Sequence, residues 1–262
     1  MNSFLHTHAD RDPQVPAQAA VIIPTTLRPG LEQAVRSVFA QNLAGTIQIL
    51  IGIDIMDGNP AQIERLIRDR PESCILQVFY PGYSTSSRHG GLHMAGDGGA
   101  LRCLLTNMAN SRYVAYLDDD NWWAPDHLSS LRTAIAKANW AFSLRWFLHP
   151  DTDTPICIDQ WESVGPDRGL FAEKAGGFVD PNTLMIDKLA CAAAVPWWNL
   201  PMPNDSHGMT ADRNVFAALL QSPPWAGTGR ATAYYRLNPG NPIHPLRRGW
   251  MGEAYDRAGF SD

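Results

Sequence analysis

The first half of the chain alternates short apolar runs with stretches of helical spacing, and this pattern most constrains the fold. The apolar runs, expected to be buried strands, occupy residues 21–24, 48–55, 75–79 and 113–117. Apolar residues recurring three or four apart predict helices around residues 31–39, 63–67, 101–108 and 128–135. Such alternation is typical of an α/β fold with a mostly parallel central sheet and flanking helices. Ligands of these sheets bind beyond the carboxyl ends of the strands, so we look for chemistry there.

Composition narrows the class of protein. With 45% hydrophobic and 18% charged residues, the chain is neither disordered nor fibrous. Its 21 Lys and Arg against 26 Asp and Glu give a net charge of −5, which argues against a nucleic-acid partner. No apolar run reaches the roughly 18 residues of a transmembrane helix, which leaves only peripheral membrane contact open. Four scattered cysteines without CxxC spacing predict free thiols in a cytoplasmic protein.

The chain is expected to hold one domain. Residues 1–16 are polar and lack the apolar core of a signal peptide, so we predict a flexible leader. Residues 17–262 contain no linker and are expected to fold together. All nine tryptophans follow residue 121, which indicates that the halves 17–121 and 122–262 differ in function.

Three consecutive carboxylates follow the last predicted strand of the first half. Asp118, Asp119 and Asp120 repel one another unless something cationic lies among them. Alternation along extended backbone puts Asp118 and Asp120 on one side and Asp119 on the other. Two hard carboxylates on one side suit Mg²⁺ or Mn²⁺, with a phosphate supplying further ligands. The alternative is a solvated acidic turn before the helix that begins near Pro125.

Other strand ends also carry polar residues. Asp54 interrupts an apolar run and needs a partner, either the donors of a ligand base or sugar or neighbouring backbone amides. Arg28 and Arg102 are candidate phosphate contacts. The glycine-rich stretch 90–99 has neither the GxGxxG nor the GxxxxGK[ST] spacing, so we expect a mobile loop rather than a dinucleotide or Walker site.

Three blocks together carry a family resemblance: VIIPTTLRPG-LEQAVRSVFAQN, IQILIGIDIMDG and SRYVAYLDDDNWWAPDHL. Over about residues 20–135 the chain resembles family 2 glycosyltransferases of the GT-A fold. The resemblance implies one GT-A-like domain, with a nucleotide-binding half (17–121) and an acceptor-binding half (122–262). It also implies an inverting, hexosyltransferase-like enzyme that uses Mn²⁺ or Mg²⁺. The sugar would move from a UDP-, GDP- or dTDP-linked donor to a hydroxyl of a carbohydrate or other acceptor.

The resemblance also assigns roles to residues of the first half. Thr25 and Thr26 would line the nucleotide pocket, and Asp54 would bind the base. Asp118 would lie near the ribose and the sugar, and Asp120 of the DxD-type motif would ligate the metal. The expected donor-binding set is Pro24, Thr25, Thr26, Arg28, Asp54, Arg102, Asp118 and Asp119.

The second half resembles the family less closely. Residues 209–220 are similar to a late helix whose Glu-Asp pair supplies the general base, which implies Asp212 as the base. Ala211 stands where the Glu would be, so Asp205 is a second candidate, and Thr210 or Asp212 is alternatively a helix N-cap. A late His completes metal coordination in some GT-A enzymes, which implies His244 as a ligand; the alternative is a surface histidine.

The acceptor side is expected to use other residues. Asn182 lies in the stretch 178–188, which resembles the strand that presents the acceptor. The flat rings of Trp197 and Trp198 suit sugar faces, although core filling is the alternative. Near the C-terminus, Arg247 and Arg248 either close over the diphosphate or form a solvated basic pair.

Two other functions stay open. A nucleotidyltransferase that makes sugar nucleotides would use a similar sheet, but it is expected to carry a glycine-rich, basic loop after the first strand, where this chain has only TTLRPG. A non-catalytic carbohydrate-binding protein could share the fold, and the Ala at position 211 keeps that alternative open.

Overall fold

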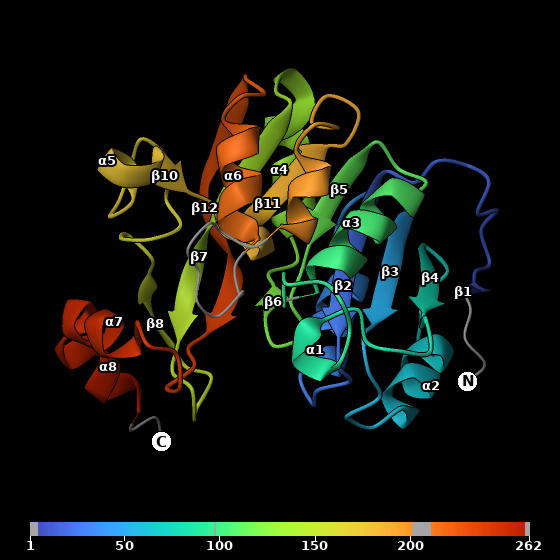
Figure 1. Ribbon diagram of the computed structural model, residues 1–262, viewed down its shortest axis with the longest axis horizontal. Helices are drawn as coiled ribbons and strands as arrows, with labels where there is room; N and C mark the ends of the chain where they lie inside the picture. The colour runs from blue at the N-terminus through green and yellow to red at the C-terminus, as the bar shows by residue number, and fades with distance from the viewer. Residues whose placement is uncertain (1–4, 97, 201–210, 260–262) are drawn as a thin grey trace.

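The four apolar runs of the first half are neighbouring parallel strands of one large sheet (Figure 1). The computed structural model describes residues 5–96, 98–200 and 211–259. In them the sheet has ten strands in the order β1-β4-β3-β2-β5-β11-β7-β12-β6, with β8 paired to β7. Its strands are β1 (Leu5–His8), β2 (Ala19–Thr25), β3 (Ile47–Ile53), β4 (Cys74–Phe79), β5 (Tyr113–Tyr116), β6 (Trp122–Trp123), β7 (Trp140–Leu148), β8 (Pro155–Ile158), β11 (Leu184–Asp187) and β12 (Trp225–Arg236).

Most strands of this sheet run in one direction. β2, β3, β4, β5, β7 and β12 share that direction, and β1, β6, β8 and β11 oppose it. β11 joins the two halves of the chain, because Met185 pairs with Ala115 of β5 and with Ala141 of β7. A separate two-stranded sheet pairs β9 (Gly165–Pro166) with β10 (Gly177–Phe178).

Helices cover both faces of the large sheet, and each face has its own apolar core. One core contains residues of α1, α2 and α4, and the other contains residues of α3, α6 and the 3-10 helix η4. The mostly parallel α/β architecture predicted from the sequence is confirmed. The helices are α1 (Leu31–Phe39), α2 (Ala61–Arg68), α3 (Gly99–Met108), α4 (His127–Ala134), α5 (Ala172–Ala175), α6 (Asp212–Leu219), α7 (His244–Met251) and α8 (Glu253–Ala258), with 3-10 helices η1 (Ser87–His89), η2 (Ile135–Lys137), η3 (Pro181–Thr183) and η4 (Val195–Asn199).

The first described residues differ from the sequence-based expectation. β1 lies within residues 1–16, which we expected to be a flexible leader, and it pairs antiparallel with the edge strand β4. Edge pairing uses backbone groups and needs no apolar run, so the polar sequence gave no signal of it. β1 and the pair α7–α8 lie at opposite ends of the long axis (Figure 1). Within the described ranges, no helix is both long and apolar enough to cross a bilayer.

Candidate active site

A buried carboxylate joins the carboxyl ends of β2 and β5. Asp119 is fully buried, and its Oδ2 accepts a hydrogen bond of 2.5 Å from Thr25 Oγ1. Its Oδ1 accepts from the guanidinium of Arg28, which also donates to Asp120 Oδ2 at 3.0 Å. Asp118 and Asp120 are partly exposed, but Asp119 and Asp120 lie in a turn and share Arg28, so the alternation predicted for extended backbone does not describe these side chains. Arg28 thus neutralises part of the triplet and leaves about half of its own side chain open to solvent.

Asp118 is held from the opposite face of the sheet. The buried guanidinium of Arg102, on α3, donates to Asp118 Oδ1. Asn182 Nδ2 donates to Asp118 Oδ2 at 2.7 Å, and Asn182 Oδ1 accepts from the Asp118 backbone N–H at 2.7 Å. Asn182, which we expected at the acceptor surface, is only 1% exposed. It therefore orients Asp118 rather than presenting its own amide to a ligand.

The Asp120 carboxylate lies between the guanidinium of Arg28 and the charge of Asp118. Burial and the nearby charge of Asp118 raise the pKa of Asp120 to about 6. Crowded carboxylates of this kind favour a bound cation, and both Asp118 and Asp120 have open side-chain surface. Across the described ranges, no group of three or more His, Cys, Asp or Glu could hold a metal by itself. The residues present fit a cation that takes its other ligands from a phosphate or water, as Mg²⁺ often does.

The turn after β2 brings α1 against the triplet. Leu27 has a positive φ of 65° and is fully buried, and its N–H donates to Thr25 Oγ1 at 2.8 Å. A methyl group added at Gly30 would collide with the backbone carbonyl of Asp119. Pro24, whose ring carbons would meet a methyl group on Gly98 at 2.6 Å, supports the start of α3. The TTLRPG sequence is thus explained by close packing between the turn and the triplet.

Asp54 has its hydrogen bonds satisfied within the chain. Its Oδ2 accepts from Ser84 Oγ at 2.5 Å, and its Oδ1 accepts from the Thr85 N–H at 2.8 Å and Oγ1 at 2.7 Å. The alternative of neighbouring donors is therefore what the structure shows, with hydroxyls added to the backbone amide. Thr26 is half-buried beside this strand end, and its carbonyl accepts from Gly58 N–H at 3.0 Å.

The candidate base lies on the same face of the sheet as Asp118. Asp212 is the first residue of α6, and its Oδ1 accepts from the Arg213 N–H at 2.8 Å. α6 buries Val215 and Phe216 in the core that also contains Tyr116, two residues before Asp118. Ala211 is the N-cap and makes no side-chain capping bond, while Thr210 and Asp205 lie outside the described residues.

The candidates near the C-terminus make their contacts with residues outside the triplet. His244 Nε2 lies 3.2 Å from Tyr255 Oη at the start of α7. With Asp118 and Asp120 it forms no metal-holding group among the residues described. Arg247 is buried and donates to Glu162 Oε2 at 2.8 Å, and exposed Arg248 pairs with Asp256. Apolar packing of α7 on its own small core, with Tyr255, accounts for this placement.

The tryptophan pair separates into one buried and one exposed ring. Trp198 is 2% exposed, its ring centroid lies 5.0 Å from that of Tyr116, and Arg102 stacks over it at 5.2 Å. Core filling is thus the role of Trp198, which supports the arginine that holds Asp118. Trp197 is 43% exposed and remains open to a ligand.

A buried ion cluster behind the site had not been predicted from the sequence. The guanidinium of Arg145 donates to Asp159 at 2.9 Å, Glu162 at 2.9 Å and Asp180 at 2.5 Å. Asp180 Oδ1 in turn accepts from Asn182 Nδ2 at 2.8 Å, so the cluster reaches Asp118 through one amide. An arginine inside the apolar strand WAFSLRWFL was the available signal, because a buried charge needs a partner.

No protein-family model and no curated protein matches the chain. Solved structures do match. S. aureus TarS 1–349 in complex with UDP-GlcNAc gives a TM-score of 0.61 at 13% identity and covers 87% of this chain and 60% of that chain. The mannosyltransferase PcManGT from Pyrobaculum calidifontis, in complex with GDP-Man and Mn²⁺, gives 0.58 at 12% identity, covering 97% and 67%. The chain thus spans about 60% of the length of TarS 1–349. It shares the α/β fold of these glycosyltransferases.

Proposed function

We propose that the chain is a glycosyltransferase that moves a sugar from a nucleotide-sugar donor to an acceptor hydroxyl. The observation that carries the proposal is the triplet Asp118–Asp120 at the carboxyl ends of parallel strands, flanked by Arg28 and Arg102. Such a strand-end position is where α/β sheets bind ligands. The shared fold supports the same class, since the neighbours hold UDP-GlcNAc or GDP-Man.

The donor would lie across the ends of β2, β3 and β5. Arg28, half of whose side chain is open, would face the diphosphate. Asp54 would bind the base once Ser84 and Thr85 release part of its carboxylate. Pro24, Thr25 and Thr26 would shape the pocket wall between them.

A divalent cation, Mn²⁺ or Mg²⁺, fits the open sides of Asp118 and Asp120. When bound there, it would neutralise charge on the departing nucleoside diphosphate. Arg102 and Asn182 fix Asp118, so the donor would meet a preorganised carboxylate. Asp212 would take the proton of the acceptor hydroxyl, and a single displacement would invert the anomeric centre.

The first test is donor binding by the Asp120→Ala variant. We expect the parent to bind UDP or GDP more tightly with Mn²⁺ than with EDTA, and the variant to lose that difference. Calorimetric titration measures the nucleotide affinity of both proteins with and without Mn²⁺. Asp69→Ala is the control, because Asp69 is a surface acid that pairs only with Arg36 and Arg68 among the contacts described. Undiminished Mn²⁺ dependence in the Asp120 variant would refute the assignment of this residue.

A second test separates transfer from binding. Asp212→Asn should bind the nucleoside diphosphate like the parent but no longer turn over a nucleotide sugar, because only the base is removed. Donor turnover at the parent rate would shift the role of base to Asp205. Pyrophosphate exchange by the parent would instead indicate a nucleotidyltransferase, and sugar binding without turnover would indicate a binding protein.

A further inference from the structure

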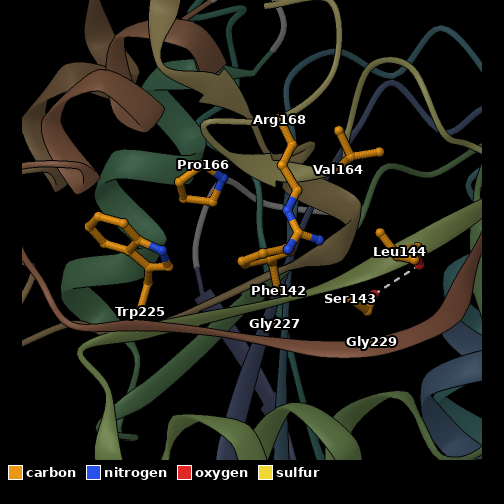
Figure 2. Close-up of a pocket in the computed structure, with 9 residues that line it drawn as sticks. All are labelled: Phe142, Ser143, Leu144, Val164, Pro166, Arg168, Trp225, Gly227 and Gly229. Atoms are coloured by element: carbon orange, nitrogen blue, oxygen red, sulfur yellow. Dashed lines mark hydrogen bonds between the residues drawn. The ribbon is translucent and has the colours of Figure 1, made fainter. Parts of the chain in front are cut away.

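A pocket of about 380 Å³ is lined by nine of the described residues, none of which belongs to the candidate active site (Figure 2). Small-molecule sites measure about 300–1,000 Å³, so this volume suits one small ring. Strands β7 and β12 form its floor, and the segment around β9 forms one wall. Its principal lining residues are Phe142, Leu144, Pro166, Arg168, Trp225 and Gly227.

Glycines and a bulge keep this pocket open. The register of β12 against β7 shifts between Gly227 and Ala231, which pushes the intervening residues out of the ladder. A methyl group on Gly227 would meet the ring of Phe142 at 3.0 Å. One on Gly165, which has a φ of 100°, would collide with the same ring. Side chains at these positions would therefore crowd the floor and wall.

The pocket lies on the same face of the sheet as Asp118 and at the same level. Met185 pairs with both Ala115 and Ala141, so Asp118 and Leu144 each lie three residues further along parallel strands. Two strand spacings separate them, which is roughly 10 Å. The direction is away from β2 and β3, where the nucleotide is proposed to bind.

Phe178 links the first turn of α6, where the candidate base lies, to one wall of the pocket. Arg213, next to Asp212, lies over the ring of Phe178 at 4.4 Å. Phe178 pairs through its backbone with Gly165, which sits between the lining residues Val164 and Pro166. The first turn of α6 and the pocket wall are therefore connected through one residue, whose ring contacts Arg213 and whose backbone pairs with Gly165.

Trp225 offers a flat apolar surface at the side of the pocket. Its ring centroid lies 5.6 Å from that of the fully buried Trp140, which fixes one side of the ring. The side chain is still 37% exposed, so its remaining surface is open to the pocket. A ring held in this way suits the apolar C–H face of a sugar, whose hydroxyls remain hydrated.

Arg168 brings a positive charge to an otherwise uncharged lining. Figure 2 shows its side chain reaching down from the wall towards Phe142. Its neighbours Asp167 and Gly169 both have positive φ, at 57° and 71°, and Asp167 N–H donates to Gly176 O at 2.8 Å, which fixes the turn. Its guanidinium makes no hydrogen bond or ion pair with any residue that the structure describes. A guanidinium so presented suits a phosphate or carboxylate.

We propose that this pocket is an acceptor subsite for a sugar unit that carries an anionic group, phosphate or carboxylate. The sugar ring packs on Trp225, and the anion pairs with Arg168. That the bound unit belongs to the acceptor rests on the proposed function, but the preference of the pocket for anionic sugars does not. Because the pocket lies beyond Asp118 from the nucleotide strands, it receives a unit next to the reacting hydroxyl rather than the donor.

Ligand-observed NMR titration tests the pocket with glucose, inorganic phosphate, glucose 6-phosphate and glucuronic acid. We expect both anionic sugars to bind about tenfold more tightly than glucose or phosphate alone, since a charge-assisted hydrogen bond contributes on that scale. Arg168→Ala should reduce their affinity to that of glucose, and Trp225→Ala should weaken all three sugars. Arg68→Ala, an exposed arginine on α2, is the matched control.

Several outcomes would overturn the subsite. Equal affinity for phosphate and glucose 6-phosphate would show that the sugar ring contributes no binding. Unchanged affinity in the Arg168 variant would show that Arg168 does not bind the anion. Trp225→Phe, which keeps an aromatic ring, should retain part of the affinity should the alanine variant fail to fold. UDP binding with Mn²⁺ is measured in the same samples, so failure of the donor proposal shows separately from failure of the pocket.

Discussion

At the scale of single residues, the amide of Asn182 both donates and accepts hydrogen bonds, and a carboxylate in its place could only accept. Its amide donates to both Asp118 and Asp180 while its oxygen accepts from the Asp118 backbone. Asn182→Ala should weaken UDP or GDP binding with Mn²⁺ about tenfold, because Asp118 loses its orientation, and should lower the free energy of unfolding by about 1–3 kcal/mol. Titration and urea unfolding measure the two effects. Asn107→Ala, at an exposed site on α3, is the control, and equal nucleotide affinity in both variants would contradict the positioning role.

His127 is a buried histidine that must remain neutral. Its Nδ1 lies 2.8 Å from Thr232 Oγ1, and its ring stacks on Trp123 with centroids 4.2 Å apart. Burial lowers the pKa of His127 from 6.5 to about 3. Between these values the unfolded chain binds more protons than the folded chain. The free energy of unfolding should therefore fall as the pH falls below about 6.5, by up to about 1.4 kcal/mol per pH unit from this group.

The variant His127→Gln isolates that contribution, because an amide does not titrate. Urea unfolding between pH 4 and 7 should show a shallower loss of stability in the variant than in the parent. His89→Gln replaces an exposed ring and should keep the parental slope. Parallel curves for all three proteins would show that His127 does not couple to folding.

At the scale of elements, strands buried on both sides were the most predictable. β2 and β3 are largely apolar runs, and α1 has a clear apolar stripe. β12 was missed because its sequence WAGTGRATAYYR mixes small, polar and charged residues, and its place is set by backbone pairing with β7. β1 was missed for a similar reason at the opposite edge. Pairing between distant segments leaves little trace in local periodicity.

Two glycines in different surroundings, Gly30 at the start of α1 and Gly249 in α7, should respond oppositely to the same substitution by alanine. A methyl group at Gly30 meets the Asp119 carbonyl, so Gly30→Ala should cost about 1–3 kcal/mol in the free energy of unfolding. Gly249 lies inside α7 with no heavy atom within 4 Å, so Gly249→Ala should stabilise by about 0.5–1 kcal/mol. Urea unfolding at neutral pH measures both, and destabilisation of equal size in the two variants would contradict the steric explanation.

At the scale of the whole molecule, the candidate site was predictable only where one segment carries it. The triplet Asp118–Asp120 is visible in the sequence because three acids end an apolar strand. Arg145 stands out inside an apolar strand, but its partners Glu162 and Asp180 each resemble an ordinary surface charge in the sequence. Their pairing exists only once β7, η3 and α7 have assembled. The local sequence likewise could not show which tryptophans fill the core and which face solvent, because Trp140 is buried and Trp225 is exposed although their sequence surroundings do not distinguish them.

The ion cluster should connect global stability to the site. Arg145→Met leaves Asp159 and Asp180 buried without their cation, which should cost about 3–5 kcal/mol in the free energy of unfolding. Arg247→Met should cost less, because Glu162 keeps Arg145. Arg257→Met, whose partner Glu253 is exposed, should change stability by less than about 1 kcal/mol. Urea unfolding at pH 7 measures the three costs.

The pH dependence of the Arg145→Met defect distinguishes lost charge pairing from lost packing. In the parent, the charge of Arg145 and three backbone amides overcome burial and hold the pKa of Asp159 below its usual value. That carboxylate stabilises the parent above its unfolded pKa of about 3.9, and the contribution disappears as the pH falls. Without Arg145, burial raises the pKa of Asp159. Its protonation as the pH falls then removes part of the destabilisation of the variant. The stability gap between parent and variant should therefore narrow from pH 7 to pH 5, and a constant gap would indicate that Arg145 acts through packing alone.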